Sequence, residues 1–310
     1  MKITLLGTGS PMPDPHRAGP STLVQAGNQN IVVDCGRGCV MRIVGAGLMP
    51  PMVTAVVLTH LHSDHISDLN DIVTTKWIMS PVYTPLVIVG PVGTKRIVDG
   101  LLMMLGPDEG YRLDHHRDLR EGPGLVLDVR EVAPGDTFQL GDVTLEVHRT
   151  DHRPVSPTVG YRITHEGKVA ALAGDTIPCA ELDALVHNAD VYVQTVLRED
   201  LVRTLAAFVP PLEERFTDIL DYHSTVQQAG DTAARNGVKK LMLTHYVPTM
   251  QPGSEEEWRA LAAEHFAGEI ILGPDLTSLE VWHFQVCALS ATHRIKQSLN
   301  QVLRVNPSVH

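Results

Sequence analysis

The sequence predicts an α/β protein in which short buried strands are interrupted by helices. Apolar runs rich in Val, Ile and Leu recur along the chain between Gly, Pro and Asp residues, and helical stretches lie between some of these runs. This order of elements builds either one large sheet or two sheets covered by helices. The 310 residues, of which 43% are hydrophobic, are enough for a substantial core.

The elements follow in order from these patterns. We expect strands at Ile3–Leu6, Ile31–Val33, Ala55–Leu58, Leu86–Val89, Leu125–Val129, Val143–Val147, Val159–Ile163, Lys168–Ala173, Val191–Gln194, Lys240–Leu243 and Ser278–Trp282. We expect helices at Gly38–Val44, Asp68–Trp77, Gly93–Leu105, Cys179–Val186, Thr225–Asn236 and Glu255–Phe266.

Two segments interrupt this pattern and are expected to form functional loops. Residues 106–124 are polar and bracketed by glycines, which predicts a loop or cap, and residues 207–222 contain Pro210-Pro211, which predicts a lid. We expect one domain over residues 1–283 and a C-terminal tail of unknown role over residues 284–310.

Composition narrows the functional class. The chain has 36 Asp and Glu against 25 Lys and Arg, a formal charge of −11, which argues against binding nucleic acid. No apolar run is long enough to span a bilayer, the N-terminus does not resemble a signal peptide, and four scattered cysteines do not form a disulfide framework. We therefore expect a cytoplasmic protein without a membrane partner.

A cluster of metal-ligand residues is the strongest functional signal. His60, His62, Asp64 and His65 fall within six residues directly after the expected strand Ala55–Leu58. Imidazole and carboxylate groups are ligands that zinc accepts. A strand that ends on this loop delivers all four side chains to one sheet edge, so the motif predicts a metal site.

Three further ligand-type residues also follow expected strands. They are His152, Asp175 and His245. Each of them is a weak signal alone, but their shared position at strand ends predicts that they converge on the first cluster. Seven ligands suit two metal ions with one bridging carboxylate.

The spacing H-x-H-x-D-H, followed by His, Asp and His at strand ends, resembles the metallo-β-lactamase superfamily over residues 1–283. The resemblance implies an αββα sandwich with two facing mixed sheets flanked by helices. It also implies two Zn²⁺, or another divalent ion such as Mn²⁺, and a bridging hydroxide as the nucleophile. Carried over by position, it places one ion on His60, His62 and His152, the second on Asp64, His65 and His245, and Asp175 between them.

A second motif, His223-Ser224-Thr225, is similar to the His-x-Thr motif of ribonuclease Z-type enzymes. That resemblance implies that His223 assists the leaving group or stabilises the transition state, and we count His223 and Asp64 as the catalytic residues. The alternative is that His223 merely precedes a helix cap.

Two departures separate the chain from that branch. Only a strand pair fits between His152 and Asp175, where ribonuclease Z enzymes carry a long tRNA-binding arm. The branch also has a His-Glu pair where this chain has Gln194-Thr195, and Asp221 or Glu199 are the candidates to replace that glutamate.

We therefore expect a dinuclear zinc hydrolase of phosphate or sulfate esters. It would be phosphodiesterase-like or arylsulfatase-like, promiscuous toward phosphotriesters, and a homodimer that acts on small anionic esters. The alternatives are a lactone or β-lactam hydrolase on the same metals and a ribonuclease Z-type endonuclease.

Overall fold

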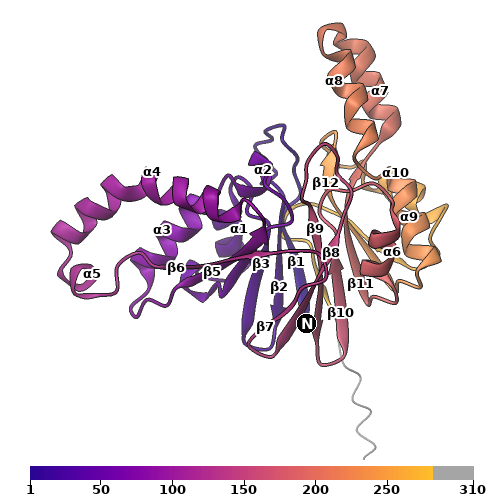
Figure 1. Cartoon of the computed structure of the whole chain (residues 1–310). Helices are drawn as coiled ribbons and strands as arrows, with labels where there is room; N and C mark the ends of the chain where they lie inside the picture. Colours follow the sequence, from indigo (N-terminus) through magenta and orange to yellow (C-terminus); the bar gives the residue numbers. More distant parts are fainter. Residues whose placement is uncertain (282–310) are drawn as a thin grey trace, which may run out of the picture.

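A computed structural model describes residues 1–281, and there two seven-stranded sheets face each other between outer layers of helices (Figure 1). The strand order is β14-β1-β2-β3-β4-β5-β6 in the first sheet and β13-β12-β11-β10-β9-β8-β7 in the second. Both sheets are mixed: β3 to β6 are parallel in the first and β10 to β13 in the second, and the other pairs are antiparallel. The expected αββα sandwich is confirmed.

The strands of the first sheet are β1 (Lys2–Gly7), β2 (Ser21–Ala26), β3 (Gln29–Val33), β4 (Ala55–Val57), β5 (Leu86–Pro91), β6 (Leu127–Val132) and β14 (Ser278–Glu280). Those of the second sheet are β7 (Thr137–Leu140), β8 (Val143–Arg149), β9 (Val159–His165), β10 (Lys168–Leu172), β11 (Val191–Leu197), β12 (Lys240–Val247) and β13 (Glu269–Ile271).

The helices are α1 (Cys39–Gly45), α2 (Ser63–Ile66), α3 (Leu69–Met79), α4 (Thr94–His115), α5 (Arg117–Glu121), α6 (Ala180–Val186), α7 (Glu199–Phe208), α8 (Glu213–Asp218), α9 (Val226–Arg235) and α10 (Glu255–Ala263). Three short 3₁₀ helices are η1 (Pro50–Met52), η2 (Pro210–Leu212) and η3 (Ile219–Asp221).

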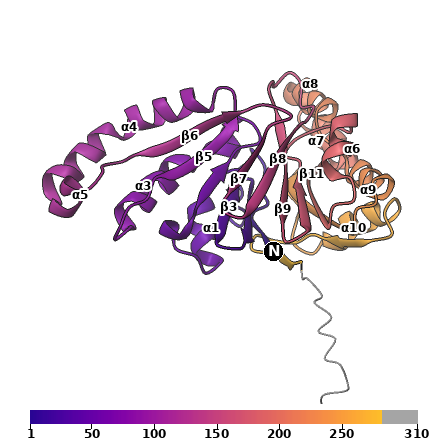
Figure 2. The same cartoon turned by 60° about the horizontal axis from the view of Figure 1, so that its bottom comes forward.

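The core has three layers of apolar side chains. The inner faces of both sheets supply the central layer, which includes Leu5, Val57, Val147 and Val193. A second layer lies beneath α1, α3 and α4 on the first sheet, and a third lies beneath α6, α9 and α10 on the second. Figure 2 shows these two sets of helices on opposite sides of the sheet pair.

Helix α9 illustrates how the sequence specifies an element locally. The Thr225 hydroxyl accepts a hydrogen bond from the Gln228 backbone N–H, and the Gln228 side chain accepts one from the Thr225 N–H. This reciprocal pair satisfies two backbone donors at the first turn and fixes where the helix begins. Val226, Ala229 and Ala233 lie on its buried face.

The structure corrects the expectation of a loop over residues 106–124. Helix α4 continues through Pro107 to His115, and α5 follows directly. An ion pair of 2.7 Å between Arg112 and Asp108, one helical turn apart, supports this extension. Figure 1 shows α5 at the end of the molecule remote from α2, so this segment is not a cap over the loop that contains the H-x-H-x-D-H motif.

The segment expected to be a lid is mostly helical. Helices α7 and α8 pack together as a hairpin that projects from the sandwich near α10, with η2 at its turn and η3 at its base (Figure 1). Phe208, at the end of α7, is 84% exposed. We call residues 199–221 the helical hairpin; whether it closes over a substrate stays a prediction.

Other expectations concern the termini and cysteines. None of the helices in residues 1–281 combines the length and the apolar character needed to cross a membrane. Cys35, Cys39 and Cys179 are free thiols. The expected tail, residues 284–310, lies outside the described residues.

Candidate metal centre

The carboxyl ends of several strands meet at one edge of the sandwich. The H-x-H-x-D-H loop follows β4, His152 follows β8, Asp175 follows β10, and His245 lies near the end of β12. The backbone N–H of Val159 donates to the Thr59 carbonyl at 2.9 Å and so joins the two sheets at this edge. All seven ligand-type residues predicted from the sequence are brought together here, in two groups.

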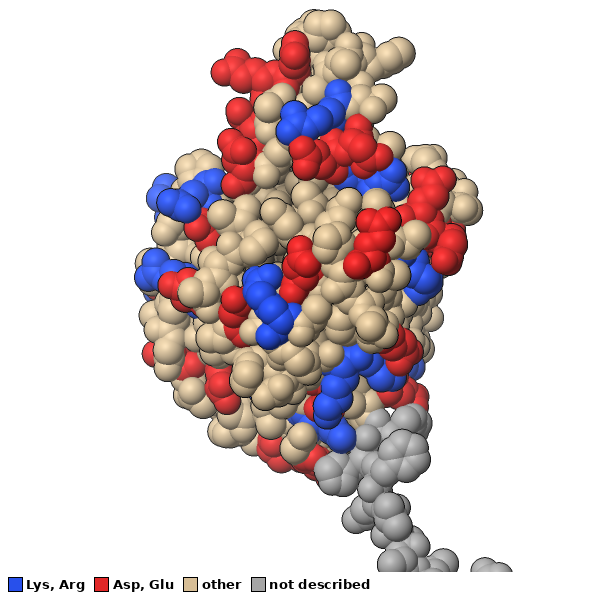
Figure 3. Space-filling model, turned by 90° about the vertical axis from the view of Figure 1, so that its right-hand side faces the viewer, with Lys and Arg blue, Asp and Glu red and all other residues tan. Residues whose placement is uncertain are grey.

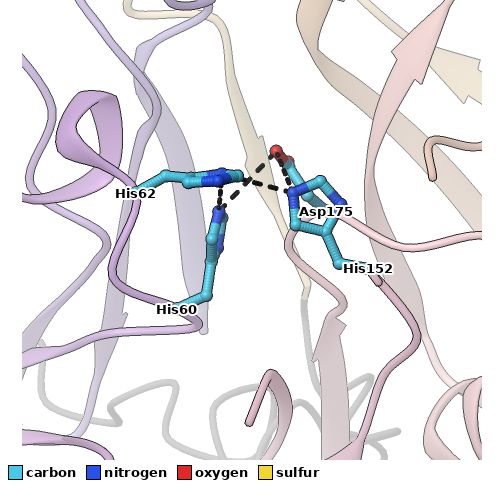
Figure 4. Close-up of side chains that lie close together, drawn as sticks. All are labelled: His60, His62, His152 and Asp175. Carbon is cyan, nitrogen blue, oxygen red and sulfur yellow. Dashed lines mark hydrogen bonds and ion pairs between the residues drawn. The ribbon is translucent and has the colours of Figure 1, made fainter. Parts of the chain in front are cut away.

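The first group contains His60, His62, His152 and Asp175, whose side chains point toward one another (Figure 4). His60 Nε2 lies 3.1 Å from His62 Nδ1, and His152 Nε2 lies 3.3 Å from that same atom. Asp175 Oδ2 is 3.9 Å from His60 Nε2 and 3.8 Å from His152 Nε2.

The second group contains Asp64, His65 and His245. Asp64 Oδ2 lies 3.6 Å from His65 Nε2 and 3.3 Å from His245 Nε2. Asp175 Oδ2 is again close, at 3.4 Å from His65 Nε2 and 3.5 Å from His245 Nε2. One carboxylate oxygen of Asp175 therefore lies between both groups.

These separations fit two divalent cations. Two ligand atoms that are each about 2.0–2.1 Å from a tetrahedral zinc ion are about 3.3 Å apart. Because imidazole and carboxylate also suit other divalent ions, the donor set fits a dinuclear site without selecting zinc.

Burial gives an independent test of the fit. His60, His65, His152, His245 and Asp175 are all at most 3% exposed. Within the described residues, His65 Nε2 and Asp175 Oδ1 are buried and have no hydrogen-bond partner. Leaving such atoms unpaired is costly, and a cation at the centre of the cluster removes that cost.

Hydrogen bonds from Nδ1 orient the imidazole rings of four histidines. The partners are the Thr59 hydroxyl for His60 at 3.1 Å, Asp34 for His65 at 2.8 Å, the Tyr222 carbonyl for His152 at 2.8 Å and the Ile219 carbonyl for His223 at 3.0 Å. An acceptor at Nδ1 places the proton there and leaves Nε2 free for a metal ion or a substrate.

Asp34 was not among the predicted site residues, although it follows directly after β3, as ligands follow other strands. Its carboxylate accepts hydrogen bonds from the Thr59 N–H, the Thr59 hydroxyl and His65 Nδ1, each at 2.8 Å. Asp34 thus connects the start of the H-x-H-x-D-H loop to the imidazole ring of the predicted ligand His65.

Gly174 sets the position of Asp175. Its φ of +66° favours glycine, and a Cβ there would lie 2.7 Å from the Thr59 side chain. The Thr195 hydroxyl donates to the Gly174 carbonyl at 2.9 Å. Gln194 and Thr195, which stand where the resembling branch has its His-Glu pair, therefore support the turn before Asp175.

The electrostatics of the cluster are those of a cation site. Burial lowers the pKa of His60 well below its usual range and that of His152 to about 4, so both imidazoles are in the neutral form that binds metals. Burial alone would also lower the pKa of His65, but Asp175 and Asp34 outweigh it and raise this pKa well above its usual range. The buried carboxylates therefore create a strongly negative potential at this position.

His223 lies against the same centre. Its Nε2 is 3.3 Å from Asp175 Oδ2, and the Ile219 carbonyl in η3 occupies the orienting position at Nδ1. A backbone carbonyl therefore orients His223, a role for which the sequence suggested Asp221 or Glu199. Glu199 instead accepts a hydrogen bond from Arg203 at 2.8 Å. The alternative interpretation, that His223 precedes a helix cap, is confirmed, since Thr225 caps α9, and the catalytic role of His223 stays a prediction.

Comparisons with known proteins agree on one superfamily. A family model described as "Beta-lactamase superfamily domain" matches residues 29–246. The protein named Ribonuclease Z from Mycolicibacterium gilvum (strain PYR-GCK) is 50% identical over 293 residues, which are 94% of this chain and 99% of that protein. Ribonuclease Z from Mycobacterium avium (strain 104) is 49% identical over 283 residues, 91% of this chain and 98% of that protein.

Solved structures share the fold at lower identity. The metallo-β-lactamase fold protein YhfI from Bacillus subtilis has a TM-score of 0.67 and 22% identity and covers 90% of this chain and 99% of its own. The short form of human tRNase Z has a TM-score of 0.64 and 21% identity and covers 91% of this chain and 100% of its own.

Proposed function

This chain belongs to the β-lactamase superfamily and, within it, to the family of the proteins named Ribonuclease Z, and from that premise we propose that it hydrolyses phosphodiester bonds in RNA. Its metal-dependent hydrolase class follows from the family and from the clustered ligands. The finer assignment to an RNA endonuclease is our proposal.

The position of Asp175 between the two ligand groups is the observation that carries the proposal. Its Oδ2 lies 3.3–3.9 Å from Nε2 of His60, His65, His152, His245 and His223. The two ligand groups and His223, which belongs to neither group, therefore converge on one point.

Each part of this arrangement serves a step of phosphodiester hydrolysis. Two divalent cations bound here would supply an activated water and neutralise charge on a nonbridging phosphate oxygen. In its doubly protonated form His223 donates Nδ1–H to the Ile219 carbonyl and carries a second proton on Nε2, 3.3 Å from Asp175 Oδ2, and this second proton can pass to the leaving oxygen. As the bond from water to phosphorus forms and the ester bond breaks, that proton converts the leaving alkoxide into a hydroxyl.

The comparisons speak against the expectation that the protein does not bind nucleic acid. That expectation rested on the net charge and on the strand pair, β9 and β10, where a long arm would be inserted. The Mycolicibacterium relative aligns over 99% of its own length, so it has no long segment that this chain lacks. A protein without a long inserted arm can therefore carry the same name.

Because the chain has a net negative charge, RNA binding requires positively charged side chains near the site. On the face shown in Figure 3, Lys and Arg side chains are interspersed with Asp and Glu, and acidic side chains also lie along one edge and at the base of the projecting hairpin. Arginines beside the metal centre are the candidates for contacts to RNA phosphates. No observation favours the sulfate esters, phosphotriesters, lactones or β-lactams that were also considered.

Hydrolysis assays on protein of measured metal content test the proposal. A structured RNA with a 3′ extension, an aryl phosphodiester, an aryl sulfate, a lactone and a β-lactam would be compared. We expect cleavage of the RNA and the phosphodiester, both lost in His60→Ala together with bound metal. His223→Ala should keep its metal and lose rate mainly on RNA, whose leaving group is poor.

His187→Ala is the matched control, because His187 is exposed and, within residues 1–281, its side chain hydrogen-bonds only to its neighbour Asn188. Turnover of the sulfate or the lactone alone, with intact RNA, would contradict the proposal. A full rate of His223→Ala on RNA would contradict the role of that histidine.

A further inference from the structure

A cavity of about 440 Å³ opens beside the first ligand group, between the H-x-H-x-D-H loop and the base of the helical hairpin. His62 and His152 line its side nearest the metal centre. Residues of the helical hairpin and the adjoining Tyr222 line another side; the hairpin residues are Arg215, Asp218 and Asp221. Its volume lies within the range of about 300–1,000 Å³ that is usual for small-molecule sites. The cavity is therefore large enough for one unit of a larger substrate next to the metal centre.

The ring of Tyr222 packs against two histidines at this position. Its backbone carbonyl accepts the Nδ1 proton of His152 at 2.8 Å, and its ring centroid lies 5.1 Å from that of His152 and 4.7 Å from that of His223. Its hydroxyl makes no hydrogen bond to any residue in the described part of the chain. An aromatic ring that lines the cavity in this way is a platform on which a nucleobase can stack.

Arg215 is the cation of the cavity that is free to bind an anion. Arg153, on the opposite wall, is bound to both carboxylate oxygens of Asp151, at 2.8 and 2.7 Å. Arg215 is exposed on α8, and among residues 1–281 no carboxylate lies within 4.0 Å of it. Because guanidinium groups match phosphate oxygens in geometry, an unpaired arginine here suits a phosphate.

Asp218 and Asp221 make the cavity selective. Two carboxylates on the same wall accept hydrogen bonds but repel an anion that has no donors. Ribose hydroxyls and base amino groups supply such donors, whereas an aryl sulfate does not. The wall therefore favours a nucleotide over a small anionic ester.

We propose that this cavity is a nucleotide subsite, in which Tyr222 stacks on the base next to the scissile phosphodiester, Asp218 and Asp221 accept hydrogen bonds from its donors, and Arg215 binds the following phosphate. The proposal rests on the function proposed above, because it requires a nucleic acid substrate. It adds the residues that distinguish RNA from a simple phosphodiester.

Steady-state kinetics on two substrates test the subsite. RNA fills the subsite, whereas an aryl phosphodiester has neither a base nor a second phosphate. Arg215→Ala should raise the KM for RNA about tenfold, reduce the slope of log kcat/KM against log salt by about one, and cost the aryl phosphodiester at most about twofold. Tyr222→Leu should raise the KM for RNA by roughly tenfold, and Tyr222→Phe should restore it, because the ring and not the hydroxyl stacks.

Arg203→Ala is the matched control, since Arg203 lies on α7 of the same hairpin and is paired with Glu199 instead of lining the cavity. Thermal melting of each variant establishes that it is folded. If the wild-type protein cleaves RNA and Arg215→Ala and Tyr222→Leu keep the wild-type KM and salt dependence, the subsite is refuted and the function stands. If the wild-type protein cleaves the aryl phosphodiester but no RNA, the proposed function and the subsite both fail.

Discussion

Replacing Asp34 with asparagine tests how the second ligand group is held in place. The Asp34 carboxylate accepts three hydrogen bonds, from the Thr59 N–H, the Thr59 hydroxyl and His65 Nδ1, all at 2.8 Å. Asparagine has the same shape but only one acceptor oxygen. In one orientation its amide group meets the donors of Thr59 and His65, and in the flipped orientation it meets the Thr59 N–H.

The magnitude follows from these contacts. Losing the outer partner of a ligating histidine costs about 10- to 100-fold in metal affinity, equivalent to about 1.4–2.8 kcal/mol. Because Asp34 is only 5% exposed, water cannot replace the lost acceptor. We also expect the free energy of unfolding to fall by roughly 1–3 kcal/mol, because the N–H donors of the new amide group would face the N–H or O–H donors of Thr59 or His65 without an acceptor between them.

Competition with a chromogenic chelator measures the metal affinity of each variant, and thermal melting shows that it is folded. Asp142→Asn is the matched control, because Asp142 also pairs with a histidine, His165, at 3.0 Å, but neither belongs to the ligand groups. The control should bind metal as the wild type does. A folded Asp34→Asn protein with unchanged metal affinity would refute the reasoning that Asp34 orients His65.

Three further predictions concern stability. Thr225→Ala removes one half of the capping pair on α9 and should lower the free energy of unfolding by about 1 kcal/mol, whereas Thr204→Ala, whose hydroxyl bonds only within α7, should cost less. Burial would raise the pKa of Asp190, but hydrogen bonds from Lys239 and the Val169 N–H outweigh it and lower the pKa. The ionised Asp190 carboxylate therefore stabilises the folded protein above about pH 4, and this stabilisation is lost as the pH falls further. The stability gap between wild type and Asp190→Asn in denaturant titrations should accordingly shrink in acid, and a constant gap would be contrary to this account. Chelation of the metals should lower the Tm by roughly 10 °C, because metal ions at a free concentration of about a thousand times their Kd stabilise the folded protein by about 4 kcal/mol. A Tm that does not change on addition of chelator would contradict a dinuclear site.

The strands that sequence predicts best are those with long apolar runs. Every expected strand is found in the residues described, but β2, β7 and β13 were not expected. In β2, the polar residues Ser21, Thr22 and Gln25 break the apolar run, and its pairing with β1 and β3 outweighs that local signal. In β13 only three residues pair, all with β12.

The helical hairpin shows the same limit for helices. Pro210-Pro211 predicted a lid and no helix was expected in this segment, yet the prolines occupy only the turn η2, where a proline at the first position of a 3₁₀ helix loses no hydrogen bond. Helix α7 forms before them because Val202 and Ala206, four residues apart, share one buried face.

The seven candidate ligands could be predicted from the sequence, because the H-x-H-x-D-H spacing after a strand and single ligand-type residues after three other strands depend on side-chain identity and local order. The groups that orient these side chains could be identified only in the folded chain. The carbonyls of Ile219 and Tyr222 hold His223 and His152 from the base of the hairpin. Every residue has a carbonyl group, so no residue type marks the ones that serve this purpose, and their roles arise only when the folded chain brings distant segments together.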